Sequence, residues 1–304
     1  MAFKASVIIA AYNCASLLKI NLKALAEQTA SQESFETIIV DDGSTDSTKE
    51  VVQSFSLKNL KYIQLAHSGR SRARNAGLAA ASGEIIIFLD SDAIPDTHFV
   101  DMHVKAHMEN QMIICRGIAV NTDNPLKRPG ITISSRFVQA SFPTYNCSVR
   151  REHLDKSSYF DQDFIEYGWE DLELGHRLLA LGLKKTLCRA VCYHCSPPLT
   201  PANVDARLCK EEERGRMAVL YCSKSPTAGT RISTMNHRTF MLVERFLNMG
   251  GWADSSAAVR LAVWFYSKRL FSLFNLITGF RLLSAYFRGL REASDARSER
   301  IGGT

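Results

Sequence analysis

The chain has 304 residues, of which 46% are hydrophobic and 22% charged, and its formal net charge is +6. These values place it in the globular class rather than the disordered one, with enough length for one large domain or two coupled ones. The eight cysteines are irregularly spaced, and the first residues lack the layout of a secretion signal. We therefore expect a cytoplasmic protein with reduced thiols.

Apolar runs and helical patterns alternate through the first 90 residues. Runs typical of buried strands lie at 6–11, 35–40, 60–65 and 85–89, and helical patterns lie between them at 17–25, 47–55 and 71–81. This alternation predicts an α/β fold with a mostly parallel, Rossmann-like sheet flanked by helices. Ligands bind such sheets beyond the carboxyl ends of the strands, so the residues that follow each run are the first candidates for a site.

Two carboxylates follow the most apolar of these runs. Residues 85–89 lead into Asp90-Ser91-Asp92, and alternate residues of an extended chain share a face, so Asp90 and Asp92 can converge on one point. Paired oxygen ligands at a strand end suit Mg²⁺ or Mn²⁺, which also accept phosphate oxygens as ligands. Taken alone, these residues fit equally well a turn in which one aspartate caps the next segment.

Polar residues also follow the first two runs. Tyr12-Asn13 comes after Ala11, and Asp41-Asp42 ends the second run. Because parallel strands end at the same edge of a sheet, we expect these residues and the pair Asp90 and Asp92 to line one site.

Four short motifs occur in a fixed order along this half of the chain: SVIIAAYN at 6–13, VDDGSTD at 40–46, ARNAG at 73–77 and FLDSD at 88–92. Together they resemble the family-2 glycosyltransferases of GT-A fold, and the resemblance covers about residues 5–195. It implies an inverting enzyme that transfers a sugar from a nucleotide sugar, most simply a UDP-sugar, with Mn²⁺ or Mg²⁺ as cofactor.

The resemblance also implies roles for individual residues. Asp92 would bind the metal, with Asp90 as a further ligand or on the ribose, and Asp41 or Asp42 would accept the imide N–H of a uracil ring. Further nucleotide contacts are implied for Ala11, Tyr12, Asn13, Arg70, Arg74 and Ser91. His67 stands where the family usually has Asn, which leaves that contact open. An Asp-Gly turn is the competing explanation for Asp41 and Asp42.

The second half of the chain is expected to hold the acceptor. A helical pattern at 99–108 and an apolar run at 112–120 precede a loop at 121–136. Residues 144–151 resemble the strand that lines the donor sugar in this family. Asn146 is the candidate sugar contact there, with a structural hydrogen bond as the alternative.

Two adjacent acids begin a helical pattern near residue 170. Leu174, Leu178 and Leu181 share one helix face, which places Glu170 and Asp171 at the helix start, where carboxylates are stabilised by the helix dipole. Acids are common at this position without any catalytic role. Against that, Trp169 directly before the pair offers a wide apolar platform suited to a sugar. The family resemblance implies that Asp171 is the catalytic base and that Glu170 contacts the acceptor hydroxyl.

A histidine and three cysteines lie near the end of this half. The resemblance implies that His194 completes the metal site with Asp92; a packed strand-end histidine is the alternative. Cys188, Cys192 and Cys195 with His194 suggest zinc, but the spacing lacks a second well-formed ligand pair, so we do not expect a zinc site here.

The C-terminal segment is basic and rich in aromatic residues. Residues 255–291 contain six Lys or Arg and no Asp or Glu, and their longest uncharged run, 270–280, is too short to span a bilayer. Arg281, Arg288 and Arg291 share one helical arc opposite an apolar arc, a pattern typical of a helix lying on an anionic membrane. Packing on the rest of the chain, or a homodimer, is the alternative. We do not expect nucleic-acid binding, because apolar residues interrupt the basic ones.

The family resemblance, together with these patterns, implies a glycosyltransferase domain at 1–220, with a nucleotide-binding half at 1–95 and an acceptor half at 96–220. A helical extension would follow at 221–291 and a disordered tail at 292–304. The predicted activity is transfer of a sugar from a UDP-sugar to a hydroxyl of a membrane-linked or surface glycan, on the cytoplasmic face of the membrane. The rival functions are a nucleotidyltransferase, whose glycine-rich phosphate loop is absent, and a non-catalytic sugar-nucleotide-binding subunit.

Overall fold

The computed structural model describes residues 3–132, 135, 140–248 and 251–302. It divides into two compact units. The sheet unit comprises residues 1–165 and 170–197, and the helical unit comprises 166–169 and 198–304. The boundary therefore lies near Pro197 rather than near residue 220, because the helix α8 (Val204–Lys224) runs continuously through position 220 and packs along α12 (Phe271–Gly302) of the helical unit.

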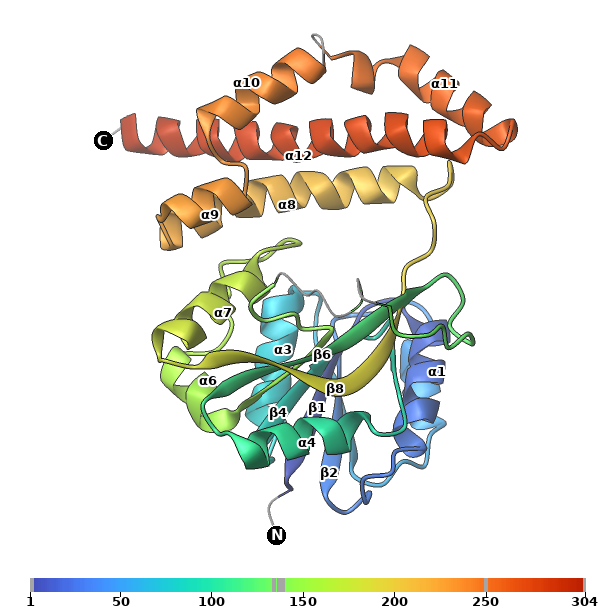
Figure 1. The fold of residues 1–304 in the computed structure, drawn as a ribbon, viewed down its shortest axis with the longest axis vertical. Helices are drawn as coiled ribbons and strands as arrows, with labels where there is room; N and C mark the ends of the chain where they lie inside the picture. Colours follow the sequence, from blue (N-terminus) through green and yellow to red (C-terminus); the bar gives the residue numbers. More distant parts are fainter. Residues whose placement is uncertain (1–2, 133–134, 136–139, 249–250, 303–304) are drawn as a thin grey trace. The chain divides into compact units, whose positions relative to one another are not determined.

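The sheet unit is built on eight strands in the order β3-β2-β1-β4-β7-β6-β8-β5 (Figure 1). β7 and β5 run against the other strands. The predicted α/β fold, with a mostly parallel sheet flanked by helices, is confirmed, and the two antiparallel strands make the sheet a mixed one. The strand bounds are β1 Ala5–Ala11, β2 Phe35–Asp41, β3 Leu60–Gln64, β4 Ile85–Leu89, β5 Ala93–Pro95, β6 Ile113–Thr122, β7 Asn146–Arg150 and β8 Lys184–Cys195.

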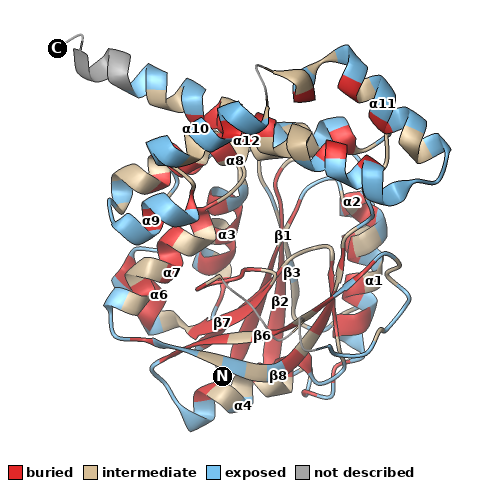
Figure 2. Ribbon diagram, turned by 45° about the horizontal axis from the view of Figure 1, so that its top comes forward, coloured by how far each residue is buried: buried red, intermediate tan, exposed pale blue. Residues whose placement is uncertain are grey.

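Helices cover both faces of this sheet. Apolar side chains of α1, α2 and α4 form one core layer with the sheet, and those of α3, α6 and α7 form the other. Successive residues of β1 and β4 alternate between the two layers, which explains why these strands read as unbroken apolar runs. All of β4 is buried, and so is every residue of β1 except Ala10 (β1 in Figure 2). The bounds are α1 Ala15–Ala26, α2 Thr48–Gln53, α3 Arg70–Ala80, α4 Phe99–Glu109, α6 Arg151–Ser157 and α7 Glu170–Ala180.

The helical unit is organised around the close packing of α8 on α12. A Cβ atom on Gly215 would lie 2.0 Å from the Tyr286 carbonyl oxygen, and one on Gly289 would lie 1.9 Å from the Glu212 carbonyl oxygen. The two backbones approach so closely only because both positions are glycine. The remaining elements are α9 Ala228–Ser233, α10 Arg238–Leu247, η1 Trp252–Asp254 and α11 Ser256–Ser267.

The C-terminal helix differs from its prediction in two ways. α12 continues to Gly302, so a helix occupies most of the segment for which a disordered tail is predicted. The basic arc of 281–291 is used within the helical unit: the Arg281 side chain is only 12% exposed, Arg288 lies 3.1 Å from Asp254, and Arg291 lies 2.9 Å from Glu244. The basic side chains of the arc therefore pair with other parts of the helical unit, and packing on the rest of the chain, the alternative interpretation, is the arrangement observed.

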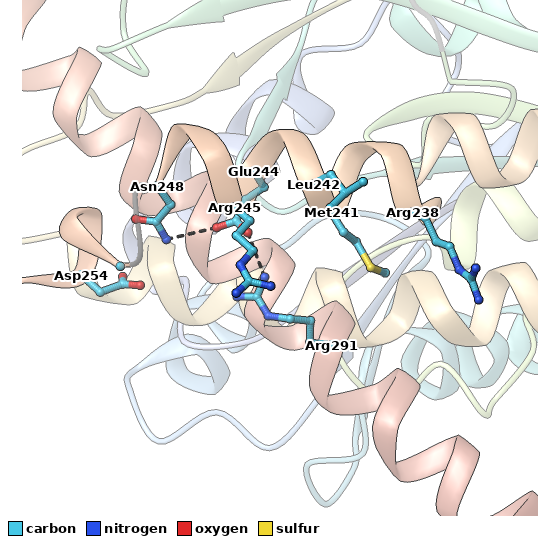
Figure 3. A pocket seen from close by; sticks show the side chains of 9 residues that line it. Arg238, Met241, Leu242, Glu244, Arg245, Asn248, Asp254 and Arg291 are labelled. Carbon is cyan, nitrogen blue, oxygen red and sulfur yellow. Dashed lines mark hydrogen bonds and ion pairs between the residues drawn. The ribbon is translucent and has the colours of Figure 1, made fainter.

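Arg291 and Glu244 also line a cavity of about 630 Å³ beside α10. Figure 3 shows that Arg238, Met241 and Leu242 reach the same cavity from α10. Within the part of the chain that the structure describes, no helix is both long enough and apolar enough to cross a membrane.

Candidate active site

The carboxylates after β2 hold two loops of the rim in place. Asp41 accepts a hydrogen bond from the Ser44 N–H (2.8 Å) and one from the Tyr62 hydroxyl (2.6 Å). Asp42 accepts from the backbone N–H groups of Ser68 (2.8 Å) and Gly69 (3.0 Å), just before α3. Both aspartates are buried. They are thus more than the turn-forming residues of an Asp-Gly pair, because they join the ends of β2 and β3 to the start of α3.

An exposed aromatic pair stands beside these carboxylates. The Tyr12 ring stacks on the His67 ring with 4.5 Å between centroids and 29° between planes. The neighbouring Asn13 is exposed, and its side-chain oxygen accepts from the backbone N–H groups of Thr45 (2.8 Å) and Asp46 (3.3 Å). Ala11 contributes only its carbonyl oxygen, which accepts from the Asp42 N–H. The flat face that the pair presents suits a planar ring such as a nucleotide base.

Strand pairing brings Asp92 and His194 together. In the antiparallel β5–β8 pair Ala93 lies opposite His194, and the Cys195 N–H donates to the Asp92 carbonyl oxygen. As a result the His194 Nε2 atom lies 3.6 Å from the Asp92 Oδ1 atom. The Asp92 side chain is 41% exposed overall, yet Oδ1 itself is buried and lacks a hydrogen-bond partner within the described residues. An orphaned carboxylate oxygen beside an imidazole is a donor set that fits a divalent cation such as Mn²⁺.

Asp90 and Asp92 differ in their surroundings. Asp90 lies 3.3 Å from the Arg74 guanidinium, whereas burial and the negative charge of Asp90 raise the pKa of Asp92. Ser91, between them, is half-buried and hydrogen-bonds the Cys14 thiol. The exposed Arg70 side chain lowers the pKa of Asp92 in part, which places its positive charge on this side of the site. Of the two acids, Asp90 is the one paired with Arg74 through its Oδ1 atom, and Asp92 is the one with a buried oxygen that lacks a hydrogen-bond partner among the described residues.

Arg74 is directed inward, not toward a nucleotide. Its guanidinium is buried, donates to Glu170 at 2.8 Å, pairs with Asp90 and lies 5.4 Å from the centre of the Phe160 ring. The predicted nucleotide contact of Arg74 is therefore replaced by a bridge between α7 and the end of β4. Glu170 is equally buried, so its predicted contact with an acceptor would have to come from its second oxygen, which has no hydrogen-bond partner among the described residues.

Asp171 has the electrostatics of a general base. Burial, followed by the negative charge of Glu170, raises the pKa of Asp171 to about 7, and the positive charge of Arg74 limits the rise. The Oδ1 atom accepts from the Leu172 N–H at the start of α7 (2.7 Å). Near neutral pH such a carboxylate exists in both protonation states, which is the condition for taking up a proton from an alcohol.

The acids of this site outnumber the cations beside them. Asp90, Asp92, Glu170 and Asp171 all act on one another or on Arg74, and Arg74 is the one buried guanidinium described among them. Clustered carboxylates with so little positive charge around them repel one another. A bound divalent cation would offset that repulsion.

Two predicted sugar contacts take structural positions. Asn146 is fully buried: its amide donates to the carbonyl oxygens of Ile118 and Ala190 (both 3.1 Å), and its Oδ1 pairs with His103 Nε2 (2.9 Å). Its side chain has no donor or acceptor left for a sugar. The structural hydrogen bond, which is the alternative interpretation, is the one observed.

Trp169 is 7% exposed and belongs to the helical unit. Its ring stacks against Tyr221 and lies under the Arg214 guanidinium, and its N–H donates to the Arg214 carbonyl oxygen. The ring therefore offers no open face to a sugar, contrary to the prediction.

The sequence does not single out Tyr145, which lies next to the metal candidates. Its ring centre is 5.6 Å from that of His194, and both residues line a cavity of about 570 Å³ together with Asn121 and Ser196. The position of Tyr145 directly before β7 is the signal that could have identified it. This cavity therefore offers space for a ligand beside His194.

Solved structures with the same architecture define the class of this fold. Mannosyltransferase PcManGT from Pyrobaculum calidifontis, solved with GDP-Man and Mn²⁺, aligns with a TM-score of 0.63 over 95% of this chain and 88% of that chain, at 20% identity. S. aureus TarS 1–349 in complex with UDP-GlcNAc aligns with a TM-score of 0.54 over 99% of this chain and 93% of that chain, also at 20% identity. The predicted GT-A-type fold is thereby confirmed.

Sequence comparison then identifies the family. The family described as glycosyl transferase family 2 matches residues 6–166, more than half of the chain, and the protein belongs to this family. It is 30% identical over 224 residues to validoxylamine A glucosyltransferase of Streptomyces hygroscopicus subsp. jinggangensis (strain 5008), which covers 60% of this chain and 53% of that protein. It is 26% identical over 239 residues to hyaluronan synthase of Pasteurella multocida, and this match covers 64% of this chain and 24% of that protein. The chain spans about half the length of the first relative and a quarter of the second.

Proposed function

We propose that the protein transfers a sugar from a nucleotide sugar, most simply a UDP-sugar, to an acceptor hydroxyl with inversion at the anomeric carbon. The observation that carries the proposal is the raised pKa of Asp171 at the edge of a carboxylate cluster that also contains the Asp92–His194 pair. Membership of glycosyl transferase family 2 supports the reaction class. The GDP-Man and UDP-GlcNAc complexes of its structural neighbours support a nucleotide sugar as donor.

Each part of the site has a role in this reaction. Tyr12 and His67 stack on the base, and Asp41 or Asp42 accepts its imide N–H, since carboxylate oxygens can accept more than one hydrogen bond. Asp92 and His194 would hold Mn²⁺ or Mg²⁺, with the charge of Asp90 close by. When bound, the metal supplies positive charge for the departing diphosphate.

The chemical step needs one base. Asp171 takes the proton from the acceptor hydroxyl while the oxygen attacks the anomeric carbon on the face opposite the diphosphate. The C–O bond to the diphosphate breaks as the new glycosidic bond forms, and the configuration inverts. Glu170 and Arg74 position the base and set its charge. A single displacement needs no carboxylate nucleophile.

A donor screen tests this function. The full chain is incubated with Mn²⁺, a panel of UDP- and GDP-sugars and mixed saccharide or lipid-linked acceptors, and the release of free nucleotide diphosphate is measured. We expect release with a UDP-sugar that depends on both metal and acceptor, and NMR of the product should show the inverted anomer. A product with retained configuration, or transfer at the wild-type rate by Asp171→Asn, would contradict the mechanism.

We further propose that the enzyme acts while peripherally bound to a membrane surface, on a membrane-linked or surface glycan. The support lies in the segment 260–276 of the helical unit, here called the α11–α12 corner. Several of its large apolar side chains are exposed, among them Trp264 at 50% and Phe271 at 51%. Three exposed basic residues accompany them: Arg260, Lys268 and Arg269.

Aromatic side chains between basic residues suit an anionic lipid surface, where the rings enter the headgroup region and the cations meet phosphate. The corner contains no acidic residue that would oppose this binding. It replaces the arc 281–291 as the proposed contact, because the cations of that arc already have carboxylate partners.

A further inference from the structure

A second group of possible metal ligands lies in the sheet unit between α4 and the sheet. His103 comes from α4, Cys115 from β6 and Cys188 from β8, and one ligand atom of each lies within 4.8 Å of those of the other two. His103 and Cys115 are fully buried, and Cys188 is half-buried. None of the three belongs to the candidate active site, and the sequence spacing does not group them.

The fold itself brings these residues together. β6 and β8 are parallel neighbours, and their pairing is irregular between Arg116 and Ile118, close to both cysteines. On the other side of β6, Cys115 lies opposite Ser148 of β7. The Ser148 hydroxyl forms a hydrogen bond with the Nδ1 atom of His103 on α4 (2.9 Å). Three elements distant in sequence therefore place a nitrogen and two sulfur atoms at one point.

The zinc set considered from the sequence is not the one assembled here. Cys192 directs its thiol toward the Tyr145 carbonyl oxygen, and Cys195 belongs to a different apolar cluster, with Ile94 and Tyr193. Only Cys188 of that set takes part. His103 and Cys115 supply the other ligand atoms.

The hydrogen bonds around Asn146 determine which nitrogen of His103 is available. The Asn146 amide group donates to two carbonyl oxygens, so its Oδ1 must face His103 Nε2 at 2.9 Å as an acceptor. Nε2 therefore carries the proton, and Nδ1 keeps its lone pair. The Nδ1 atom accepts a hydrogen bond from the Ser148 hydroxyl (2.9 Å), which a bound ion would replace, and it lies 3.9 Å from the Cys188 sulfur. A metal-binding imidazole usually donates its other ring N–H to a carbonyl or carboxylate oxygen, which fixes its tautomer, and the Asn146 oxygen does this for His103.

The distances suit a tetrahedral ion. With Zn–N of about 2.0 Å and Zn–S of about 2.3 Å, the nitrogen–sulfur edge of a tetrahedron is about 3.6 Å. The observed edge between His103 Nδ1 and Cys188 Sγ is 3.9 Å. Side-chain shifts of a few tenths of an ångström are enough to close the site around an ion, and the half-buried Cys188 leaves a way in from solvent.

The donor set also selects the kind of ion. Two thiolates and a neutral imidazole balance the charge of a divalent cation, so the ion could be buried without net charge. Thiolate and imidazole favour zinc, whereas Mg²⁺ and Mn²⁺ favour oxygen ligands. The carboxylate site at Asp92 and this group thus select different metals.

We propose that His103, Cys115 and Cys188 form a structural site for a zinc-type, thiophilic divalent cation, with water as the fourth ligand. Such an ion would tie α4 to β6 and β8. β8 carries His194 at its far end, so the ion would also stiffen the strand that positions the active-site histidine. The proposal stands independently of the glycosyltransferase reaction.

Cobalt binding tests the site without any activity assay. The full chain is stripped of metal with a chelator, kept reduced, and titrated with Co²⁺. We expect about one equivalent to produce the near-ultraviolet absorption of thiolate-to-cobalt charge transfer, and added Zn²⁺ to abolish it. Cys188→Ser should weaken cobalt binding by at least about 100-fold, since it removes a direct ligand. Cys209→Ser, which changes an exposed cysteine of α8, should bind like wild type.

Further variants separate this site from the active site. Asp92→Asn should keep the charge-transfer absorption in full, because it alters only the carboxylate site. Circular dichroism establishes that Cys188→Ser is folded, and Zn²⁺ should raise the melting temperature of wild type but not of this variant. Cobalt spectra without charge transfer in folded wild type, or an unchanged spectrum in folded Cys188→Ser, would overturn the proposal.

Discussion

The Arg74 guanidinium lies 2.8 Å from the Glu170 carboxylate, although 96 residues separate them in the chain. The same guanidinium lies 3.3 Å from Asp90, so one buried cation joins the start of α7 to the residues that follow β4. These two places carry the proposed base and the proposed metal ligands. Arg74 therefore holds the proposed base and the proposed metal ligands at a fixed spacing. It also affects the charge of the base, because it limits the rise of the Asp171 pKa.

Replacing Arg74 should impair both folding and catalysis. We expect Arg74→Met to lower the free energy of unfolding by about 3–5 kcal/mol, since it leaves buried carboxylates without their cation. In the fraction that folds, the pKa of Asp171 should rise above 7, so transfer should require a higher pH. Urea denaturation and a pH–rate profile measure these effects. The exposed Arg72, two residues earlier on α3, provides the control: Arg72→Met should change neither the stability nor the pH profile. An unshifted pH profile in folded Arg74→Met would exclude the electrostatic role.

Asp171→Asn should separate catalysis from binding. Removing a general base costs about 10²- to 10⁴-fold in rate, whereas the affinity for UDP should stay within a small factor of wild type. In the wild type, kcat should rise with pH and level off above about 7 as Asp171 loses its proton. Stopped assays over pH 5–9 and calorimetric titration with UDP provide the two measurements. Full activity in the variant would remove Asp171 from the mechanism.

Asp171→Asn, which should lower activity, should raise stability above neutral pH. The pKa of Asp171 is raised on folding, so the folded chain holds a proton that the unfolded chain has lost between about pH 4 and 7. The contribution of Asp171 to stability is thus retained at low pH and falls as the pH rises through this window. Asparagine does not ionise, so Asp171→Asn should melt at a higher temperature than wild type at pH 8 and at a similar one at pH 4. Equal melting temperatures at pH 8 would contradict the burial of this charge.

Asp92→Asn should reduce metal-dependent nucleotide binding. The change keeps the shape of the side chain but removes the charge of its orphaned oxygen. We expect the affinity for UDP in the presence of Mn²⁺ to fall by about 10-fold or more, and the affinity without metal to stay the same. Asp123→Asn, at an exposed position, is the matched control. If the Mn²⁺-dependent part of binding survives in Asp92→Asn, the metal lies elsewhere.

The sequence is enough to locate the rim of the site but not the interactions inside it. Asp41, Asp90 and Asp171 can be found because each follows a strand or begins a helix, and such ends are visible in local patterns. The partners of Arg74 are not visible, because a buried ion pair depends on how α3 and α7 pack together. Trp169 looks like a sugar platform in sequence for the same reason: the residues that cover it, Tyr221 and Arg214, come from a helix about 50 positions further on.

The C-terminal helix illustrates a different limit. An amphipathic pattern has the same period whether its apolar face meets a membrane or another helix, so the pattern at 281–291 could not decide between them. Helix packing is what the structure shows, because Glu212 of α8 and Glu244 of α10 pair with Arg288 and Arg291. The grouping of His103 with Cys115 and Cys188 is likewise set by the order of strands in the sheet, which spacing alone does not reveal.

The stacked pair of Tyr12 and His67 should contribute directly to nucleotide affinity. Stacking of a base on an aromatic side chain is worth about 1–3 kcal/mol, so Tyr12→Ala should weaken UDP binding by roughly 5- to 150-fold. Tyr12→Phe should bind almost as tightly, because it keeps the ring. Fluorescence or calorimetric titration with UDP and with ribose 5-phosphate, which has no base, distinguishes stacking from a general loss of structure. Equal losses for both ligands would argue against stacking.

The α11–α12 corner should carry the membrane affinity. Replacing Trp264 and Phe271 by serine removes two exposed rings, and we expect the double variant to lose most of its binding to vesicles that contain anionic phosphatidylglycerol. Co-sedimentation measures the bound fraction, with neutral phosphatidylcholine vesicles to separate charge from apolar contact. Arg269→Glu should weaken binding to the anionic vesicles in particular, and high salt should have the same effect.

Phe246→Ser, which changes an exposed ring on α10, is the matched control for the loss of a surface aromatic. Binding that survives in the double variant, or that falls equally in the control, would exclude the corner as the contact; a wild-type chain that sediments with neither kind of vesicle would exclude a membrane partner altogether.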